Sequence, residues 1–478
     1  MYNMATDLTQ PPPTAAPGHP QRWLILGVIA LAQLTVLLDN TVLNVAIPSL
    51  KRELGASTSD VQWMINAYSL VQAGLLLTAG SSADRYGRKK MLVTGLVLFG
   101  AGSLAAALAS STGQLIAARA GMGVGGALLT TTTLALAMQI FPPDEQPRAI
   151  GIWAAVNSLG FAAGPLIGGF MLGHFWWGAI FLINLPVAAG ALAAVLVLVP
   201  ESKNPEGDRP DLLGAVLSTV GMSSLVFTII SGPEHGWSSA RVLGSGAVAV
   251  VVLAVFAWWE NRVPYPMLDM SFFRNRRFTG AVAGAVLVVF GMGGALFLLT
   301  QHLQLVLGYG PLEAGFRTAP LAAVIILLNF TGAAAKITVK LGGPMTILLG
   351  MFVMACGLVS IGVLGERGYA GTLLGLVLIG VGTATASPAM GHAIMSSIPP
   401  AKAGVGAGIN GMLAEFGMGL GVAVLGAVLT SSPSLEQGLR EGQLVGAVAV
   451  AAGGMAAGVL LRRAAGTKTP DLAGRPGR

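Results

Sequence analysis

The chain has 478 residues, of which 54% are hydrophobic and only 10% are charged, and its mean hydropathy is +0.74. Soluble domains carry roughly 25% charged residues, so this composition excludes an ordinary soluble protein and indicates a multi-pass membrane protein. The net charge of +7 comes mainly from basic residues in short loops and does not indicate a nucleic-acid partner. A single cysteine, Cys356, excludes an intrachain disulfide and a cysteine-based metal cluster.

Hydropathy, with Pro, Gly and charge clusters as breaks, predicts fourteen transmembrane helices. The charge-free runs between these breaks are long enough for one or two spans of about 20 residues each. The expected helices, in chain order, are 22–47, 60–82, 90–110, 114–140, 148–170, 180–199, 211–231, 240–260, 278–300, 314–335, 344–364, 371–394, 404–430 and 443–461.

The basic residues predict the orientation of these helices. With a cytoplasmic N-terminus, most of the 27 Lys and Arg residues fall on the inner side, and an even number of spans returns the C-terminus to the cytoplasm. Six basic residues fall on the outer side: Lys51, Arg52, Arg241, Arg317, Arg367 and Arg440. Residues 1–20 do not resemble a signal peptide, so the first helix is expected to be retained.

A repeat with an offset of 257 residues relates helices 4 and 5 to helices 12 and 13. Eight residues coincide without a gap, and they are Gly123, Gly125, Pro142, Pro143, Gly151, Gly160, Gly164 and Gly169, which fall on Gly380, Gly382, Pro399, Pro400, Gly408, Gly417, Gly421 and Gly426. Six helices would fit a shorter offset, so helices 7 and 8 look like an insertion. Parallel repeats of this kind build transporters in which two halves rock about a central site.

The expected fold is therefore an all-α integral membrane protein with two six-helix pseudo-repeat bundles and two inserted helices. Its parts are a cytoplasmic tail at 1–21, an N-terminal bundle at 22–200, the inserted helices with cytoplasmic loops at 201–277, a C-terminal bundle at 278–461 and a cytoplasmic tail at 462–478.

Two opposite charges fall inside the predicted spans, in the outer half of the membrane. Asp39 lies about 13 Å and Arg119 about 8 Å below the outer ends of their helices. An isolated charge at such a depth is costly, whereas a carboxylate that faces an arginine or a water-filled cavity is tolerated. We therefore predict that Asp39 is a proton-binding switch. An ion pair with only a packing role, and an Arg119 that snorkels to the outer surface, are the alternatives.

Glu415 raises the same question in the second half of the chain. It lies roughly 17 Å from the inner end of its helix, near the membrane midplane. It is either a glutamate hydrogen-bonded between helices or a second carboxylate facing the cavity. In the second case it binds a cationic substrate or carries a second proton.

Two glycine-rich stretches have specific patterns. "GSSADRYGRKKML" (80–92) is either an ordinary basic loop or a charge network that holds one conformation closed, built from Gly80, Asp84, Arg85, Gly87, Arg88 and Lys89. "GFAAGPLIGGF" (160–170) predicts a close-packing face and a local kink, from Gly160, Gly164, Pro165, Gly168 and Gly169.

The candidate substrate cavity is defined by polar and adaptable apolar residues within the spans. As an alternative to lining a cavity, the amides would form hydrogen bonds between helices. The aromatic residues and methionine would instead be packed in the protein or face the lipid. The candidates are Asn40, Asn44, Asn66, Trp153, Asn157, Phe161 and Met412.

Together these motifs resemble the major facilitator superfamily, over nearly the whole chain. The 80–89 segment is similar to its G-x-x-x-D-R-x-G-R-[KR] loop, and "RAGMGVG" at 119–125 is similar to its helix-4 motif, with Met122 in place of the usual glutamine. The 160–170 stretch resembles the antiporter signature. "LLDNTVLNVAIP" and "FLINLP" (181–186) resemble motifs of the 14-helix drug:proton antiporter family.

The sequence departs from this family in two places. Residues 177–179 read Trp-Gly-Ala where relatives commonly have W-R-W, and Asn66 occupies a helix-2 position at which some exporters of dicationic compounds have aspartate. A preference for divalent cations is therefore not expected.

The resemblance implies a proton-coupled antiporter that exports lipophilic drugs or antibiotics across a bacterial plasma membrane by alternating access. Asp39, Arg119 and Glu415 would carry the coupling. The implied partners are a small lipophilic, in some cases cationic, substrate, protons and the lipid bilayer, with a monomer as the working unit and no cofactor, metal or nucleic acid. The sequence contains neither a Walker A pattern nor a recognisable set of catalytic residues, so we do not expect an enzyme. The alternative is an exporter, symporter or facilitator of a specific metabolite.

Overall fold

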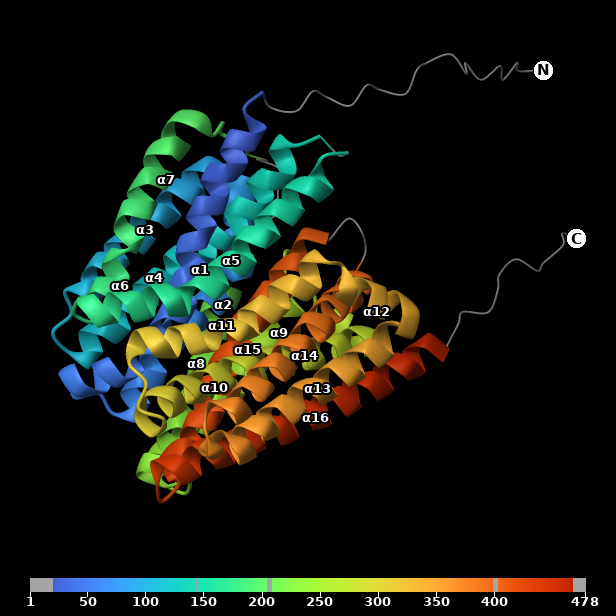
Figure 1. Cartoon of the computed structure of the whole chain (residues 1–478). Helices are drawn as coiled ribbons and strands as arrows, with labels where there is room; N and C mark the ends of the chain where they lie inside the picture. The colour runs from blue at the N-terminus through green and yellow to red at the C-terminus, as the bar shows by residue number, and fades with distance from the viewer. Residues whose placement is uncertain (1–19, 143, 204–208, 399–402, 467–478) are drawn as a thin grey trace, which may run out of the picture.

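The computed structural model describes residues 20–142, 144–203, 209–398 and 403–466. The predicted tails at 1–21 and 462–478 lie largely outside these ranges. Within them the chain folds into helices and forms no strand. The N-terminal helices, blue to green in Figure 1, and the C-terminal helices, yellow to red, form two groups.

The helices follow the predicted spans closely. In chain order they are α1 (Arg22–Glu53), α2 (Thr58–Tyr86), α3 (Arg88–Ala107), α4 (Thr112–Ile140), α5 (Gln146–His174), α6 (Ala179–Leu182), α7 (Asn184–Leu198), α8 (Leu212–His235), α9 (Ala240–Glu260), α10 (Arg276–Gln301), α11 (Pro311–Phe330), α12 (Ala333–Leu341), α13 (Gly343–Leu364), α14 (Tyr369–Met395), α15 (Ala403–Ser431) and α16 (Leu435–Gly466).

The structure differs clearly from the sequence prediction at four helices. α1 extends to Glu53, beyond the expected end at 47, and α16 begins at Leu435, well before the expected start at 443. The sixth predicted span is divided into α6 and α7, and the helix expected at 314–335 ends at Phe330. The short helix α12 follows directly, because Gly332 adopts a left-handed conformation with φ of 67° that ends α11.

Twelve helices of the described chain are long and apolar enough to cross a membrane. Neither α2 nor α5 is among them, although each has 29 residues and packs within the protein. α2 is less apolar because it contains Gln62, Asn66 and Gln72. These polar side chains are buried inside the protein.

Each of the two groups of helices is held together by contacts at small residues. In the N-terminal bundle (α1 to α7), α4 packs against α2 at Gly123 and against α3 at Gly125. In the C-terminal bundle (α10 to α16), α14 packs against α11 at Gly380 and against α13 at Gly382. The 257-residue offset therefore pairs glycines that each lie at a close contact between two helices.

The same offset relates the two seams between the bundles. A side chain at Gly169 of α5 would meet the backbone of α11 at Pro311, and one at Gly426 of α15 would meet Gln62 of α2. The bundles thus contact each other along α5 with α11 and along α2 with α15. Both seams require glycine because no space remains for a side chain.

The pair α8 and α9 is joined to α2 by Asp211. The Asp211 carboxylate accepts hydrogen bonds from the Gly214 backbone N–H at 2.8 Å and from Trp259 Nε1 at 2.9 Å, which caps α8 and ties it to α9. Thr78 of α2 donates to the Asp211 carbonyl at 3.1 Å. α8 also packs against α15, so this pair of helices contacts both bundles.

Candidate functional site

Asp39 of α1 and Arg119 of α4 form a buried ion pair inside the N-terminal bundle. The Arg119 Nη1 atom donates to Asp39 Oδ2, and only 4% of Asp39 and 1% of Arg119 is exposed. Arg119 Nε also donates to the Met64 carbonyl of α2 at 3.0 Å. Of the alternatives, the structure therefore favours an arginine directed into the protein over one that snorkels to the surface.

Three neighbouring side chains fix the geometry of this ion pair. Asn184 of α7 donates to Asp39 Oδ1 at 3.4 Å and to Ser103 Oγ of α3 at 3.0 Å. The Arg119 guanidinium lies over the Tyr68 ring of α2, 4.4 Å from its centroid. Residues from five helices thus surround this ion pair, and their contacts hold the two charges in place.

Glu415 of α15 faces this cluster from the C-terminal bundle. Its Oε1 atom accepts hydrogen bonds from Asn40 Nδ2 of α1 at 3.5 Å and from Gln72 Nε2 of α2 at 3.3 Å. Ser69 lies beside the same carboxylate, and Arg119 is within electrostatic range of it. The Oε2 atom is buried and receives no hydrogen bond of normal geometry from the described residues. Glu415 therefore joins the two bundles through neutral hydrogen-bond donors of α1 and α2.

The predicted cavity residues do not all lie in one place. Asn40 and Asn44 line a small cavity of about 10 Å³ between α1, α2, α10 and α15. Asn66 is fully buried against Gly419 and donates to the Gln62 carbonyl of its own helix at 2.9 Å. Trp153 is partly exposed, and its Nε1 atom has no hydrogen-bond partner among the described residues.

Met412 is buried in the apolar core of the C-terminal bundle. The side chains of Asn157 and Phe161 lie outside the described residues. The role of these residues as a substrate cavity therefore stays a prediction.

The loop between α2 and α3 forms a charge network within the N-terminal bundle. Arg88 donates to Asp84 Oδ1 from two nitrogen atoms, at 2.9 and 2.7 Å, and to Gln139 of α4 at 2.7 Å. Lys89 Nζ donates to the Leu196 carbonyl of α7 at 2.8 Å. Gly87 has φ of 119°, which permits the turn between the two helices.

Glu201, just after α7, completes this network and was not predicted from the sequence. Its carboxylate accepts hydrogen bonds from the backbone N–H groups of Lys89 and Lys90 at 3.1 and 3.2 Å. An acidic side chain at these first-turn N–H groups also interacts favourably with the dipole of α3. In the sequence, the role of Glu201 could have been suspected only from its position as the first charged residue after the sixth predicted span.

The glycines of the 160–170 stretch pack α5 against α1, the helix that carries Asp39. Side chains at Gly160, Gly164 and Gly168 would meet Leu37, Thr41 and Val42 of α1, respectively. Pro165 contacts α11 through Gly315, so one segment of α5 contacts both bundles. The close packing of α1 and α5 therefore positions Asp39 indirectly.

Four polar side chains connect the bundles on the face opposite the termini, and we call them the inter-bundle latch: Lys51, Gln62, Gln301 and Gln304. Lys51 Nζ of α1 donates to Gln301 Oε1 of α10, and Gln304 Nε2 donates to the Val45 carbonyl, both at 3.0 Å. Gln62 of α2 donates to the carbonyls of Val422 and Ala423 of α15 at 3.0 and 2.9 Å. None of these residues was predicted to act across the bundles.

At the termini face, the ion pair between Arg22 of α1 and Glu145 stays within the N-terminal bundle. Arg22 donates to both oxygens of Glu145, at 2.6 and 2.9 Å. This guanidinium holds the pKa of Glu145 below its usual value, so the carboxylate stays ionised. In Figure 1 the two groups of helices diverge toward the side from which both termini leave.

Known proteins with similar sequences include proteins named as efflux pumps and as resistance proteins. The model of the Major Facilitator Superfamily matches residues 29–422. "Multidrug efflux pump LfrA" of Mycolicibacterium smegmatis is 36% identical over 442 residues, which are 91% of this chain and 87% of LfrA. "Multidrug resistance protein Stp" of Mycobacterium tuberculosis is 35% identical over 425 residues, which are 87% of this chain and 79% of Stp.

A solved structure has the same fold at low sequence identity. The peptide transporter POT in complex with sulfate aligns with a TM-score of 0.71 and 17% identity. The alignment covers 95% of this chain and 96% of POT.

Proposed function

The chain belongs to the Major Facilitator Superfamily, and from this premise we propose that it is a proton-coupled antiporter that exports lipophilic drugs or antibiotics. The observation that carries this proposal is the pairing of Asp39 with Arg119 next to a second, partly buried carboxylate, Glu415, on the other bundle. A multidrug efflux pump and a multidrug resistance protein among its relatives support the class of substrate.

We infer that Asp39 carries the transported proton. A buried carboxylate remains ionised only while a cation and hydrogen-bond donors stabilise it, and here Arg119 and Asn184 do so. When Asp39 takes up a proton, its attraction for Arg119 falls. The guanidinium then becomes available to Glu415, which is already within electrostatic range. Proton binding in one bundle would thereby change the charge balance in the other.

Glu415 is the proposed contact for cationic substrates. Its carboxylate forms no ion pair with any described residue, and a substrate cation would supply the missing counter-charge. Asn40, which donates to Glu415, is the neighbour of Asp39 on α1. A short segment of one helix therefore connects the proton site with the substrate site.

The geometry between the bundles supports alternating access. Two six-helix bundles related by the 257-residue repeat, with α8 and α9 as an insertion and fourteen spans in total, would rock about the seams of α5 with α11 and α2 with α15. With both termini in the cytoplasm of a bacterial cell, the inter-bundle latch closes the outer face. The conformation described here would then be closed to the outside. No cofactor is required, and a monomer contains every residue of this scheme.

Expression of the gene in an efflux-deficient bacterial host tests this function. We expect raised resistance to several lipophilic compounds, and we expect an uncoupler of the proton gradient to abolish the accompanying efflux. Resistance to no compound in a broad panel would contradict drug export and favour a dedicated metabolite exporter. Efflux that persists with the uncoupler would contradict proton coupling.

The Glu415→Gln variant tests the substrate contact separately. We expect it to lose export of cationic substrates about tenfold or more while neutral substrates are still exported, because the amide removes the charge that a cation pairs with. Glu436→Gln is the matched control, since Glu436 is an exposed glutamate on α16. An unchanged profile for both substrate types in Glu415→Gln would remove Glu415 from the substrate site.

A further inference from the structure

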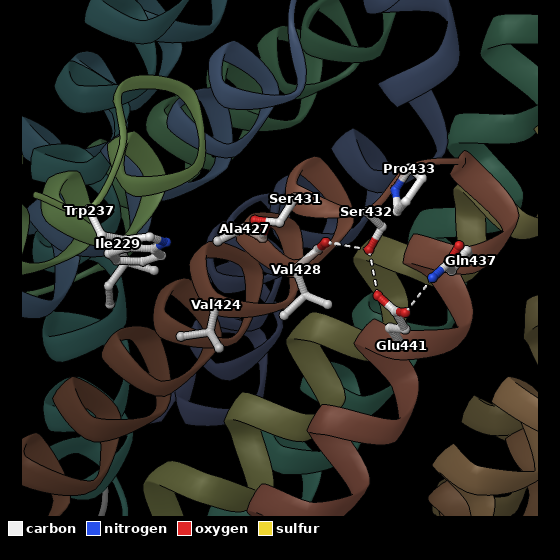
Figure 2. A pocket seen from close by; sticks show the side chains of 10 residues that line it. All are labelled: Ile229, Trp237, Val424, Ala427, Val428, Ser431, Ser432, Pro433, Gln437 and Glu441. Atoms are coloured by element: carbon white, nitrogen blue, oxygen red, sulfur yellow. Dashed lines mark hydrogen bonds between the residues drawn. The ribbon is translucent and has the colours of Figure 1, made fainter.

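A groove of about 410 Å³ lies on the face opposite the termini, far along α15 from Glu415. It is formed by the ends of α8 and α15, the start of α16 and the turn after α8 (Figure 2). Its volume falls within the range of pockets that hold drug-sized ligands. A substrate of the proposed function would therefore fit in this groove.

The lining of the groove is apolar at one end and acidic at the other. Figure 2 shows Trp237 beside Ile229 at one end and Glu441 at the other, with Val424 and Val428 of α15 between them. A ligand that satisfies this lining has an apolar body and one charged or strongly polar group.

The polar end carries a negative charge. Glu441 accepts hydrogen bonds from Ser432 Oγ and Gln437 Nε2, both at 2.7 Å. It forms no ion pair with any described residue, although Arg440 is within electrostatic range. Because its partners are neutral, the carboxylate keeps its attraction for a cation.

The apolar end carries an exposed aromatic ring. One side of the Trp237 indole packs against Gly232, where an added side chain would meet the ring at 2.6 Å. The residue is nevertheless 56% exposed. An exposed indole face stacks on aromatic groups and attracts organic cations. Trp237 at one end of the groove and the Glu441 carboxylate at the other are therefore both suited to bind an organic cation.

α15 connects this groove to the inter-bundle latch and to Glu415. Val424, in the wall of the groove, directly follows the two residues whose carbonyls accept hydrogen bonds from Gln62. Ser431 at the end of the groove lies about 24 Å along the helix from Glu415. An opening of the latch would separate this part of α15 from α2 and would place the groove beside the opening.

From these observations we propose that the groove is a second binding site for organic cations with an apolar body, used as they leave the protein. The cationic group lies against Glu441 and Ser432, and the apolar body lies over Val424 and Val428 and reaches Trp237. This inference rests on the proposed export of lipophilic cations. It adds a separate site on the release side, reached after the substrate has left Glu415.

Photolabelling locates the bound cation directly. The full-length protein is placed in dodecyl maltoside micelles, which contain no amine, and labelled with an aryl-azide derivative of tetraphenylphosphonium, and labelled peptides are identified by mass spectrometry. We expect label on segments 229–237 and 424–441 that is displaced by tetraphenylphosphonium and not by neutral triphenylphosphine oxide. Absence of label from both segments in the unaltered protein would overturn the proposal.

Substitutions then test the two ends of the groove. Glu441→Gln should reduce groove labelling about tenfold and Trp237→Ala about fivefold, as expected for the loss of a charge-assisted contact and a cation–π contact. Glu441→Asp should retain most of the label, and Glu436→Gln, on the same helix outside the groove, should retain all of it. Equal labelling of the Glu441→Gln and unaltered proteins would contradict the proposal.

Two further readouts separate this inference from its alternatives. Label on the peptide around Glu415, together with cation export, reports on the proposed function whatever happens in the groove. Failure confined to the groove therefore overturns only the second site. If phosphatidylethanolamine nanodiscs abolish the groove label at the same probe concentration, the site binds a lipid amine headgroup, and its assignment to exported cations is wrong.

Discussion

Asp39 and Arg119 are both almost completely buried, so the removal of either charge leaves the other without its partner. The energetic role of such a pair differs from that of a surface ion pair, because each ion has lost its hydration. Asn184 and Tyr68 reduce that cost from the two sides of the pair. The pair is thus stable as a unit and sensitive to any change in the charge of Asp39.

We predict strongly non-additive effects of substitutions at this pair. Asp39→Asn should destabilise the protein by about 3–5 kcal/mol because it leaves the buried Arg119 charge uncompensated. Asp39→Asn combined with Arg119→Gln should recover part of this loss, since no charge remains. Thermal unfolding in detergent of the two single variants and the double variant measures the coupling. Additive effects would show that the two side chains do not act as a pair.

The sequence predicts that these two charges lie at similar depths, and the structure pairs them, but their other contacts could not be predicted. Helical rise alone brings Asp39 and Arg119 into the same half of the membrane. The contacts of Asn184, Tyr68 and Met64 depend on how α2 and α7 rotate about their axes, and apolar spans give no clear periodicity from which to derive that rotation. Glu415 stands out in the sequence as a charge inside an apolar span, whereas nothing distinguishes its donor Gln72 from the other amides of the spans.

At the scale of helices, the packing of α5 on α1 depends on the absence of side chains at specific positions. Gly164 lies directly against Thr41, and the Leu38 carbonyl lies 3.3 Å from where a methyl group would be. Gly173, on the same helix, has nothing within 4 Å of that position. α5 therefore contains both a test position and its control.

We predict opposite effects of alanine at these two glycines. Gly164→Ala should lower thermal stability and transport because α5 must move away from α1, the helix of Asp39. Gly173→Ala should be neutral or stabilising by up to about 1 kcal/mol, since alanine favours a helix over glycine. Thr41→Ala added to Gly164→Ala should restore part of the stability. Equal behaviour of both single variants would contradict the close-packing role of the stretch.

The helix boundaries were predictable because they follow hydropathy and charge, whereas the short elements were not. Arg22, Arg88 and Arg276 mark helix starts at which a basic loop meets an apolar run. The break between α6 and α7, and the helix α12, arise from local backbone geometry such as the left-handed Gly332. Hydropathy averaged over a span does not detect such local features.

For the whole molecule, the inter-bundle latch distinguishes the two faces. Gln62 alone contributes two hydrogen bonds between α2 and α15, and Lys51 and Gln304 add one inter-bundle bond each. All of these must break for the face opposite the termini to open. Their loss should therefore shift the balance between conformations and leave each bundle intact.

Distance measurements between spin labels test this shift. We substitute the single cysteine, Cys356, by serine and place labels at Asp144 and Lys336, which are exposed and lie in different bundles. Gln62→Ala should increase the population with a shorter distance at the termini face about fivefold or more, since two hydrogen bonds of about 1 kcal/mol each are lost. Gln114→Ala, whose hydrogen bonds remain within the N-terminal bundle, is the control. An unchanged distribution in Gln62→Ala would contradict the latch.

The central claim is that proton binding at Asp39 drives export, and transport by the purified protein in proteoliposomes tests it most directly. With a pH gradient imposed, the unaltered protein and the control Asp144→Asn should accumulate a cationic substrate against its concentration gradient. Asp39→Asn should still bind the substrate, which shows that it is folded, and should equilibrate it at most. Uphill accumulation by Asp39→Asn under the same gradient would contradict the account.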